Sequence, residues 1–345
     1  MPMKTQLIIV LLAASLAPVS CAKMEDGASP VKRQVGFDVT VSRGGGQATK
    51  ADSQLEMNPD IPFGLVGVDL QAHSLLIDNS AVMRSGEGSY SLDLQQGPWE
   101  KAAPISFSAY YPYVRDIRYQ NGYESYIIPY SAEETGAGPL VSKTVQAAVD
   151  QMNMVPLEFQ HITNDIGFAI CDATEDPRLQ GLIHLRKVTA TNVAQAGVFE
   201  NDITTSNGIW YRQGYYRDIV VFEGDAPVGV GSKGERFIGD NQLVTQKHLS
   251  HRYYSIPDEI EMGKQTVEVV YDVDGFTLGE EYHQPMKGLT ARFCLYGLLP
   301  GNTFVYGKQY TFHLGLDLGT VSRPISFSAG ISDWETKIYE NNEDF

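Results

Sequence analysis

Apolar residues alternate with polar or small residues along many short segments of this chain. Val35, Phe37, Val39 and Val41 show this period of two, and it recurs at residues 267–273, 289–295 and 310–318. Successive side chains of a strand point to opposite faces, so the pattern predicts strands with one buried face. It is typical of antiparallel sheets, because strands of parallel α/β sheets are apolar on both faces. The alternation therefore predicts an all-β fold.

Further strands are expected at residues 63–70, 89–94, 105–111, 123–129, 166–171 and 182–188. The 33 glycines and 17 prolines suit short strands joined by turns. One short helix is predicted, because Val141, Val145, Val149 and Met152 share a helical stripe. A polar stretch at 192–197 divides the pattern. We therefore expect two sandwich domains, residues 34–194 and residues 195–345.

One hexapeptide occurs twice. PISFSA stands at residues 104–109 and again at 324–329, with Trp99 before the first copy and Trp334 after the second. A single repeat of this length is too little for a solenoid. Two interpretations stay open: comparable strands of two similar sandwiches, or coincidence in a chain rich in Ser and aromatic residues.

The N-terminus has the features of an export signal. Lys4 is followed by an apolar run at residues 7–12 that is too short to span a bilayer, and small residues lead to Cys21. Residues 1–20 are therefore interpreted as a signal peptide. Their end resembles the bacterial lipoprotein pattern, in which Cys21 becomes the acylated first residue, although Pro18 stands where Leu is usual. The alternative is an ordinary signal peptide with Cys21 as a bystander.

Residues 21–33 are expected to form an acidic linker. The segment Lys23-Met24-Glu25-Asp26 resembles the acidic tag with which Bacteroidota lipoproteins reach the outer surface of the outer membrane. Acyl chains on one residue would anchor the chain stably, at about 0.8 kcal/mol per buried CH₂.

The charge balance excludes one class of partner. The chain has 42 Asp and Glu against 26 Lys and Arg, a formal net charge of −16. Such a surface repels phosphate backbones, so we expect no nucleic-acid partner.

Motifs of catalysis or cofactor binding are weak. Residues 229–234 match GxGxxG, but no helical pattern follows, and Lys233 is followed by Gly rather than Ser or Thr. His248 and His251 lack an HExxH context, and residues 272–275 fit an Asp-Gly turn better than a calcium loop. No GxSxG elbow occurs. We therefore expect no enzyme, no cofactor and no metal site.

Three cysteines cannot form a disulfide framework. Cys171 and Cys294 lie in strand patterns, which favours buried thiols. The alternative is a disulfide between these two cysteines.

Four segments carry a resemblance to a known family. Trp99 followed by PISFSAYYP at 104–112 resembles a strand motif of fimbrillins, the type V pilus subunits of Bacteroidota. The other segments similar to fimbrillins are PLEFQH at 156–161 with IGFAI at 166–170, RYYSIP at 252–257 with TVEVVY at 266–271, and ISFSA at 325–329 before Asp333-Trp334. The four segments follow one another in the order found in fimbrillins, and together they span nearly the whole chain. Asp258 departs from the pattern, where the family has Gln.

The resemblance implies two transthyretin-like Greek-key β-sandwich domains in tandem. It implies a fimbrial or accessory subunit in cell adhesion, held in the outer membrane as a surface-exposed lipoprotein. Its partners would be other pilus subunits and a host or bacterial surface ligand. In shaft members of the family, a trypsin-like protease cuts after an Arg that follows the first strand. That strand leaves, and a strand of another subunit replaces it.

Two segments of this sequence match those roles. Arg43 directly follows the strand 34–42 and precedes three glycines, so it is the candidate processing site. The displaced strand would be the one with Val35, Phe37, Val39 and Val41. The alternative is that Arg43 is a solvated loop residue without a role in processing. Cleavage after Arg33, before the strand, would leave the sandwich intact.

The candidate donor strand lies near the C-terminus. Ile325, Phe327, Ala329 and Ile331 alternate there, either as donor or as the last strand of the second sandwich. The sequence leaves the shaft, anchor and tip roles open.

Two other functions compete. A surface glycan-binding lipoprotein would use clustered aromatic side chains, for which residues 210–211, 215–216 and 253–254 are candidates. A secreted hydrolase would need an acid–base pair, and no spacing indicates one.

Overall fold

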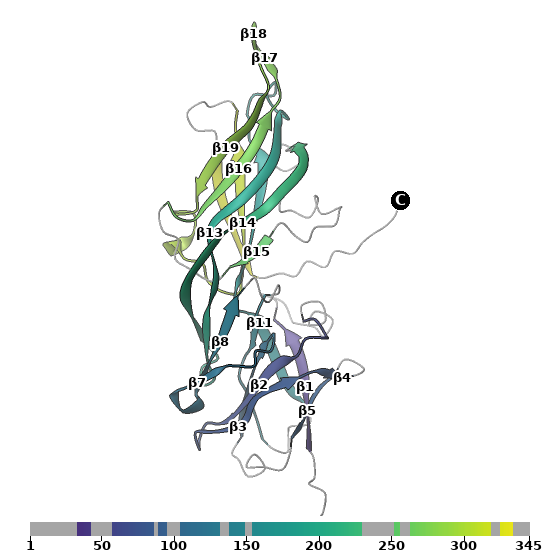
Figure 1. Cartoon of the computed structure of the whole chain (residues 1–345), viewed down its shortest axis with the longest axis vertical. Helices are drawn as coiled ribbons and strands as arrows, with labels where there is room; N and C mark the ends of the chain where they lie inside the picture. Colours follow the sequence, from purple (N-terminus) through teal and green to yellow (C-terminus); the bar gives the residue numbers. More distant parts are fainter. Residues whose placement is uncertain are drawn as a thin grey trace, which may run out of the picture.

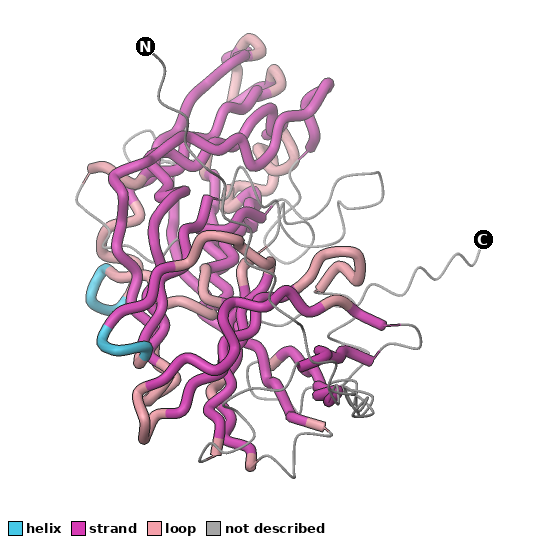
Figure 2. Tube along the Cα trace, turned by 60° about the horizontal axis from the view of Figure 1, so that its bottom comes forward, coloured by secondary structure: helices cyan, strands magenta, loops and turns pink. Residues whose placement is uncertain are grey.

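The computed structural model describes residues 33–42, 57–85, 89–94, 104–131, 138–148, 154–229, 252–255, 263–318 and 325–333. Nearly all of its regular structure is strand (Figure 2). The first half holds β1 (Arg33–Val41), β2 (Phe63–Asp69), β3 (Ser74–Val82), β4 (Arg84–Ser85), β5 (Ser89–Leu94), β6 (Ile105–Tyr111), β7 (Arg118–Gln120), the 3₁₀ helix η2 (Asn121–Tyr123), β8 (Ser125–Ser131), β9 (Leu140–Ser142), β10 (Val145–Ala147) and β11 (Val155–His161).

Two residues separate β11 from the remaining elements. They are β12 (Asn164–Asp172), β13 (Ile183–Asp202), β14 (Gly208–Gly229), β15 (Arg252–Ser255), β16 (Thr266–Val273), β17 (Phe276–Leu278), β18 (Glu281–His283), β19 (Met286–Cys294), the 3₁₀ helix η5 (Pro300–Asn302), β20 (Lys308–Leu316) and β21 (Ile325–Asp333).

One nine-stranded sheet builds the N-terminal half. Its order is β3-β2-β6-β9-β11-β1-β5-β4, with β10 also paired to β6. The N-terminal core, which we define as the buried cluster around Phe37, Phe63, Phe107 and Phe159, lies against this sheet. Its aromatic rings pack edge to face, as in the Phe63–Phe159 pair with centroids 5.6 Å apart.

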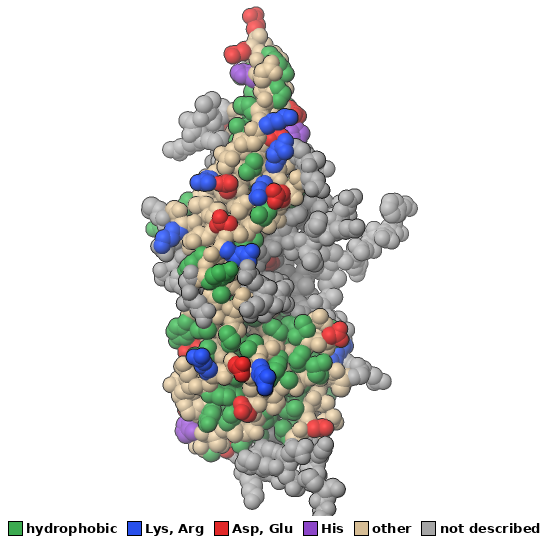
Figure 3. Space-filling view, viewed as in Figure 1, with side chains coloured by type: hydrophobic (Ala, Val, Ile, Leu, Met, Phe, Trp, Pro, Cys, Tyr) green, Lys and Arg blue, Asp and Glu red, His purple; other side chains and the backbone are tan. Residues whose placement is uncertain are grey.

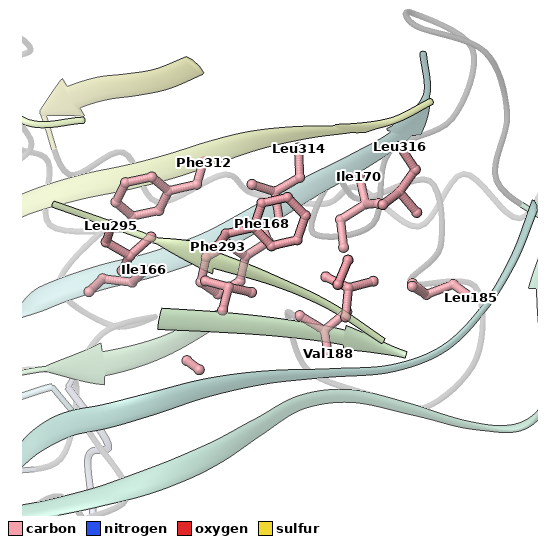
Figure 4. Packing of buried hydrophobic residues seen from close by; sticks show 14 of the residues in the cluster. Ile166, Phe168, Ile170, Leu185, Val188, Phe293, Leu295, Phe312, Leu314 and Leu316 are labelled. Carbon is pink, nitrogen blue, oxygen red and sulfur yellow. The ribbon is translucent and has the colours of Figure 1, made fainter. Parts of the chain in front are cut away.

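Two sheets face each other in the C-terminal half. The sheet β15-β12-β20-β21 packs against the β19-β16-β13 part of a second sheet, whose order is β19-β16-β13-β8-β7 and to which β14 is added beside β13. Figure 4 shows the side chains between them, with Phe168 and Phe312 on one sheet and Phe293 and Val188 on the other. Most alternate residues of β16 are buried, so the apolar face of this strand supplies part of the core.

A long strand joins the two halves. Residues 183–190 of β13 pair with β16, whereas residues 196–202 pair with β8. The molecule is accordingly elongated, with β1 near one end and the β17–β18 hairpin at the other (Figure 1). The boundary expected between residues 194 and 195 falls inside β13, and the two tandem domains stay a prediction.

The all-β sandwich prediction is confirmed. The helix prediction is wrong: Val141 lies in β9 and Val145 in β10, because these residues pair with β11 and β6, while Val149 and Met152 lie outside the described residues. Among the described residues, no helix is long and apolar enough to cross a membrane.

Candidate functional site

The first strand, β1, lies inside the N-terminal sheet rather than at its edge. Residues 33–37 pair antiparallel with β5, and residues 37–41 pair parallel with β11. Beyond the strand, the Ser42 amide donates to the Phe159 carbonyl at 2.6 Å. Both neighbours of β1 therefore depend on it for backbone hydrogen bonds.

The four apolar residues of β1 are buried in the N-terminal core. Val35 and Val41 are 0% exposed, Phe37 2% and Val39 5%. Burying a large apolar side chain contributes about 1.5–3 kcal/mol. Loss of β1 would therefore expose an apolar groove between β5 and β11 together with unpaired backbone amides. Such a groove favours pairing with another strand.

Phe37 is the aromatic residue of this strand. Its ring centroid lies 6.1 Å from that of Phe63, at an interplanar angle of 86°, and 6.2 Å from that of Phe107, at 71°. These edge-to-face contacts are favourable geometries for aromatic rings. The Phe37 ring therefore has an aromatic environment formed by Phe63 and Phe107.

The C-terminal strand β21 is at an edge of its sheet. All nine of its residues pair antiparallel with β20, from Ile325 opposite Leu316 to Asp333 opposite Lys308. Among the described residues, β20 is its only strand partner. An edge strand of this kind presents a row of backbone groups to a further strand.

Some predicted residues lie outside the described part of the chain. Cys21 and Arg43 are among them, although Ser42, immediately before Arg43, is described at the end of β1. Arg33 begins β1, opposite Leu94. Most of the GxGxxG match and both His248 and His251 also lie outside, and only Gly229 is described, as the last residue of β14.

Two aromatic pairs of the glycan-binding hypothesis, residues 210–211 and 215–216, are each divided between two faces. Tyr211 is 47% exposed and donates to Glu200 Oε2 at 3.0 Å. Trp210 turns inward, packs against Phe199 and donates from Nε1 to the Ile162 carbonyl at 2.6 Å. Tyr215 is exposed, whereas Tyr216 packs against a buried cluster. Adjacent strand residues point to opposite faces, so neither pair forms a two-ring platform.

The two carboxylates of the Asp-x-Asp-Gly segment, residues 272–275, make contacts with other residues of this chain. Asp272 accepts from Arg186 Nε at 2.7 Å and Nη2 at 2.6 Å, and from the Gly288 amide at 2.9 Å. Asp274 lies 2.6 Å from His184 Nε2. Among the described residues, no group of three or more His, Cys, Asp or Glu side chains is arranged to hold a metal ion.

The Arg186–Asp272 pair makes stability acid-sensitive. Hydrogen bonds from Arg186 lower the pKa of Asp272 to about 2, from an ordinary value of 3.8. A carboxylate with a lowered pKa stabilises the fold above pH 4, and this stabilisation is lost as the pH falls toward 2. We therefore expect Asp272→Asn to reduce the loss of unfolding free energy between pH 5 and pH 2, measured by urea denaturation. Glu268→Gln, in the exposed Glu268–Arg292 pair, is the matched control. An equal acid response in wild type and Asp272→Asn would contradict this prediction.

The sequence patterns did not reveal a buried polar network. Tyr126 OH lies 2.9 Å from Ser108 Oγ, and Asn201 Nδ2 donates to Ser108 Oγ at 3.0 Å. All three side chains are buried, on β6, β8 and β13. The only signal in the sequence was the Ser between apolar residues of β6. Cys171 and Cys294 are not joined by a disulfide.

Solved structures of other proteins resemble this fold. A candidate cell adhesion protein of Parabacteroides distasonis is 12% identical, with a TM-score of 0.55 over 90% of this chain and 98% of its own. A fimbrial protein of Bacteroides vulgatus is 12% identical, with a TM-score of 0.51 over 87% and 100%. A candidate cell adhesion protein of Bacteroides uniformis is 14% identical, with a TM-score of 0.50 over 88% and 98%. These likenesses show a shared fold.

The family comparison agrees with the sequence motifs. No curated protein matches the chain in sequence. The model of the fimbrillin-like family matches residues 49–334, which begin after β1 and include β21. Because the match spans most of the sequence, this chain belongs to the fimbrillin-like family.

Proposed function

We propose that this chain is a surface subunit of a fimbrium that acts in cell adhesion and assembles by strand exchange after proteolysis. Its role would be structural and adhesive rather than catalytic. Family membership and a fold shared with a fimbrial protein and candidate adhesion proteins support this role. The observation that carries the mechanism is the insertion of β1 between β5 and β11, with its four apolar side chains in the core.

The proposed trigger is hydrolysis of the peptide bond after Arg43. This residue lies directly beyond Ser42, the last described residue of the β1 segment. After the cut, β1 would be held only by non-covalent contacts and could be exchanged for a strand of another subunit. Residues 21–43 would leave together, so the same cut would separate a lipid anchor on Cys21 from the sandwich.

The candidate incoming strand is β21. It is near the C-terminus and pairs with a single described strand, so it can leave its sheet with fewer lost contacts than an internal strand. The partners would be other subunits, and the proposed location is the fimbrium and the outer membrane.

Arg43→Ala is expected to block processing. Wild-type material sheared from the cell surface should begin at Gly44, while the variant should retain β1 and give few laddered oligomers on unboiled gels. N-terminal sequencing and the gel together measure both effects. Arg33→Ala is the matched control, because Arg33 is the first residue of β1 and its replacement leaves the bond after Arg43 intact. A wild-type start at Val35 or earlier would overturn the trigger.

A further inference from the structure

The exposed members of two aromatic pairs lie on one face of β14. Tyr211 lies opposite Val198 of β13, and its side chain is 47% exposed. Tyr215 lies opposite Ala196 of β13, and its side chain is 45% exposed. Directly opposite residues share a face of the sheet, and alternate residues of β13 do so too, so both tyrosines are on the same face. Their partners are two residues apart on β13, a span of roughly 6–7 Å.

This face extends across four strands. Arg118 of β7 lies opposite Ile127 of β8, and Ile127 lies opposite Glu200 of β13. On its other side, Glu200 lies opposite Ile209 of β14. Side chains that point the other way, such as Phe199, are buried. We call the side with this cross-strand row and the two tyrosines the outer face.

Two hydrogen bonds hold the carboxylate of Glu200 on the outer face. Tyr211 OH donates to Oε2 at 3.0 Å, and Ser125 Oγ donates to Oε1 at 2.8 Å. A carboxylate oxygen has two lone pairs, so each oxygen has capacity for a further hydrogen bond from a ligand. The bond from Tyr211 also restrains its own ring. The acceptor and the ring are therefore ordered before a ligand binds, which lowers the entropic cost of binding.

The outer face also exposes apolar surface beside these polar groups. Among the described residues, Ile209 is the most exposed large apolar side chain, at 59%. Pro129 of β8, which lies opposite Val198, is exposed as well. Exposed apolar surface with polar groups around it is typical of binding sites. Arg118 is exposed at the β7 end of the row and adds hydrogen-bond donors.

A sugar has the two kinds of surface that this face complements. One side of a pyranose ring presents C–H groups, which pack on the face of a tyrosine ring, and its edge presents hydroxyl groups, which donate to a carboxylate. Tyr211 and Tyr215 offer places for two sugar units along β14. Glu200, bonded to Tyr211, is the acceptor beside the first of them.

The charge of the chain selects among sugars. Asp and Glu outnumber Lys and Arg by 42 to 26, and acidic side chains occur on both halves of the molecule in the view of Figure 3. Together with Glu200, this charge repels sialic acid and sulfate groups. A strongly basic partner would in turn meet Arg118 in the same row as Glu200. The ligand class that fits is a neutral oligosaccharide.

We propose that the outer face is a carbohydrate site for a neutral oligosaccharide of at least two units. Sugar rings pack on Tyr211 and Tyr215, and sugar hydroxyl groups donate to Glu200. This inference goes beyond the proposed function, because binding at the outer face needs neither the cut after Arg43 nor assembly into a fimbrium.

The test uses the uncut full-length chain. The probes are an array of neutral oligosaccharides, with sialyllactose and sulfated heparin oligosaccharides beside them, and titration calorimetry then measures affinity for the strongest ligand. We expect this ligand to be neutral, and its monosaccharide to bind at least about tenfold more weakly. Tyr211→Ala, Tyr215→Ala and Glu200→Gln should each weaken binding about tenfold or more, a loss near 1.4 kcal/mol.

Tyr282→Ala is the matched control. Tyr282 is 56% exposed, like the two tyrosines of the site, but it lies on β18, outside the outer face. Its replacement should leave the affinity unchanged. Circular dichroism of all four variants checks that each is folded as the wild type is.

The outcomes are separate from those of the proposed function, which laddered oligomers measure. Absence of binding to every neutral oligosaccharide, or a stronger response to sialyllactose or heparin, would overturn the inference. Unchanged affinity in folded Tyr211→Ala and Tyr215→Ala would do the same. Dimers of the wild type that are lost in Ile209→Ser, without any bound sugar, would assign the outer face to a contact between copies instead.

Discussion

Replacing Phe37 by Ala lowers the free energy of unfolding of the intact chain by about 3–5 kcal/mol, the range observed for Phe→Ala in packed cores. Phe37 is 2% exposed and contacts the rings of Phe63 and Phe107. The substitution removes these contacts and leaves a cavity that a sheet strand paired with both β5 and β11 cannot close. Urea denaturation of the chain before any cut at Arg43 measures the change.

Gln34→Ala is the matched control for this prediction. Gln34 is on the same strand, is exposed, and donates to Ser91 Oγ at 3.1 Å. Its loss should change stability by no more than about 0.5 kcal/mol, as is usual for surface substitutions. A loss below about 1 kcal/mol for Phe37→Ala would mean that β1 is not an integral part of the core, and the strand-exchange proposal would lose its physical basis.

Deleting residues 324–345 is expected to abolish assembly while leaving a folded monomer. The deletion removes β21, which pairs only with β20 among the described strands. The apolar side chains of β20 keep their contacts with β12 and β19 in the C-terminal core, because Phe312 stacks on Phe168 and lies in the same cluster as Phe293. Laddered oligomers on unboiled gels measure assembly, and circular dichroism measures folding.

A shorter deletion is the control. Removing residues 335–345 takes away the polar tail beyond β21 and should leave assembly unchanged. If the longer deletion instead prevents folding, β21 belongs to the core of the C-terminal sandwich, and the donor must be sought elsewhere.

Strand positions could be predicted from the sequence where a local pattern was strong. The segments expected at 89–94 and 105–111 coincide with β5 and β6. The alternation at Val35–Val41 likewise indicated which side chains of β1 would be buried. These predictions succeed because the direction of a strand side chain follows from the covalent geometry of its own backbone.

Predictions failed where pairing across the chain decides the structure. The stripe with Val141 and Val145 is compatible with a helix, but pairing with β11 and β6 makes these residues strands. The strand expected at 182–188 continues to Asp202, because β14 pairs with it along its length. Ser106 and Ser108 alternate with Ile105 and Phe107 along β6, yet all seven residues of the strand are buried, because β6 is covered on both faces.

The residue pattern alone is enough to show that the chain is all-β, which residues of the strongly alternating strands are apolar, and that an arginine follows the first of these strands. The position of this strand between β5 and β11, and the contacts of Phe37 with Phe63 and Phe107, follow from the folded arrangement of distant segments. Side-chain alternation is a local property of each segment. The neighbours of a strand depend on the closure of long loops and on packing among distant residues, such as the parallel pairing of Phe37 with Val155.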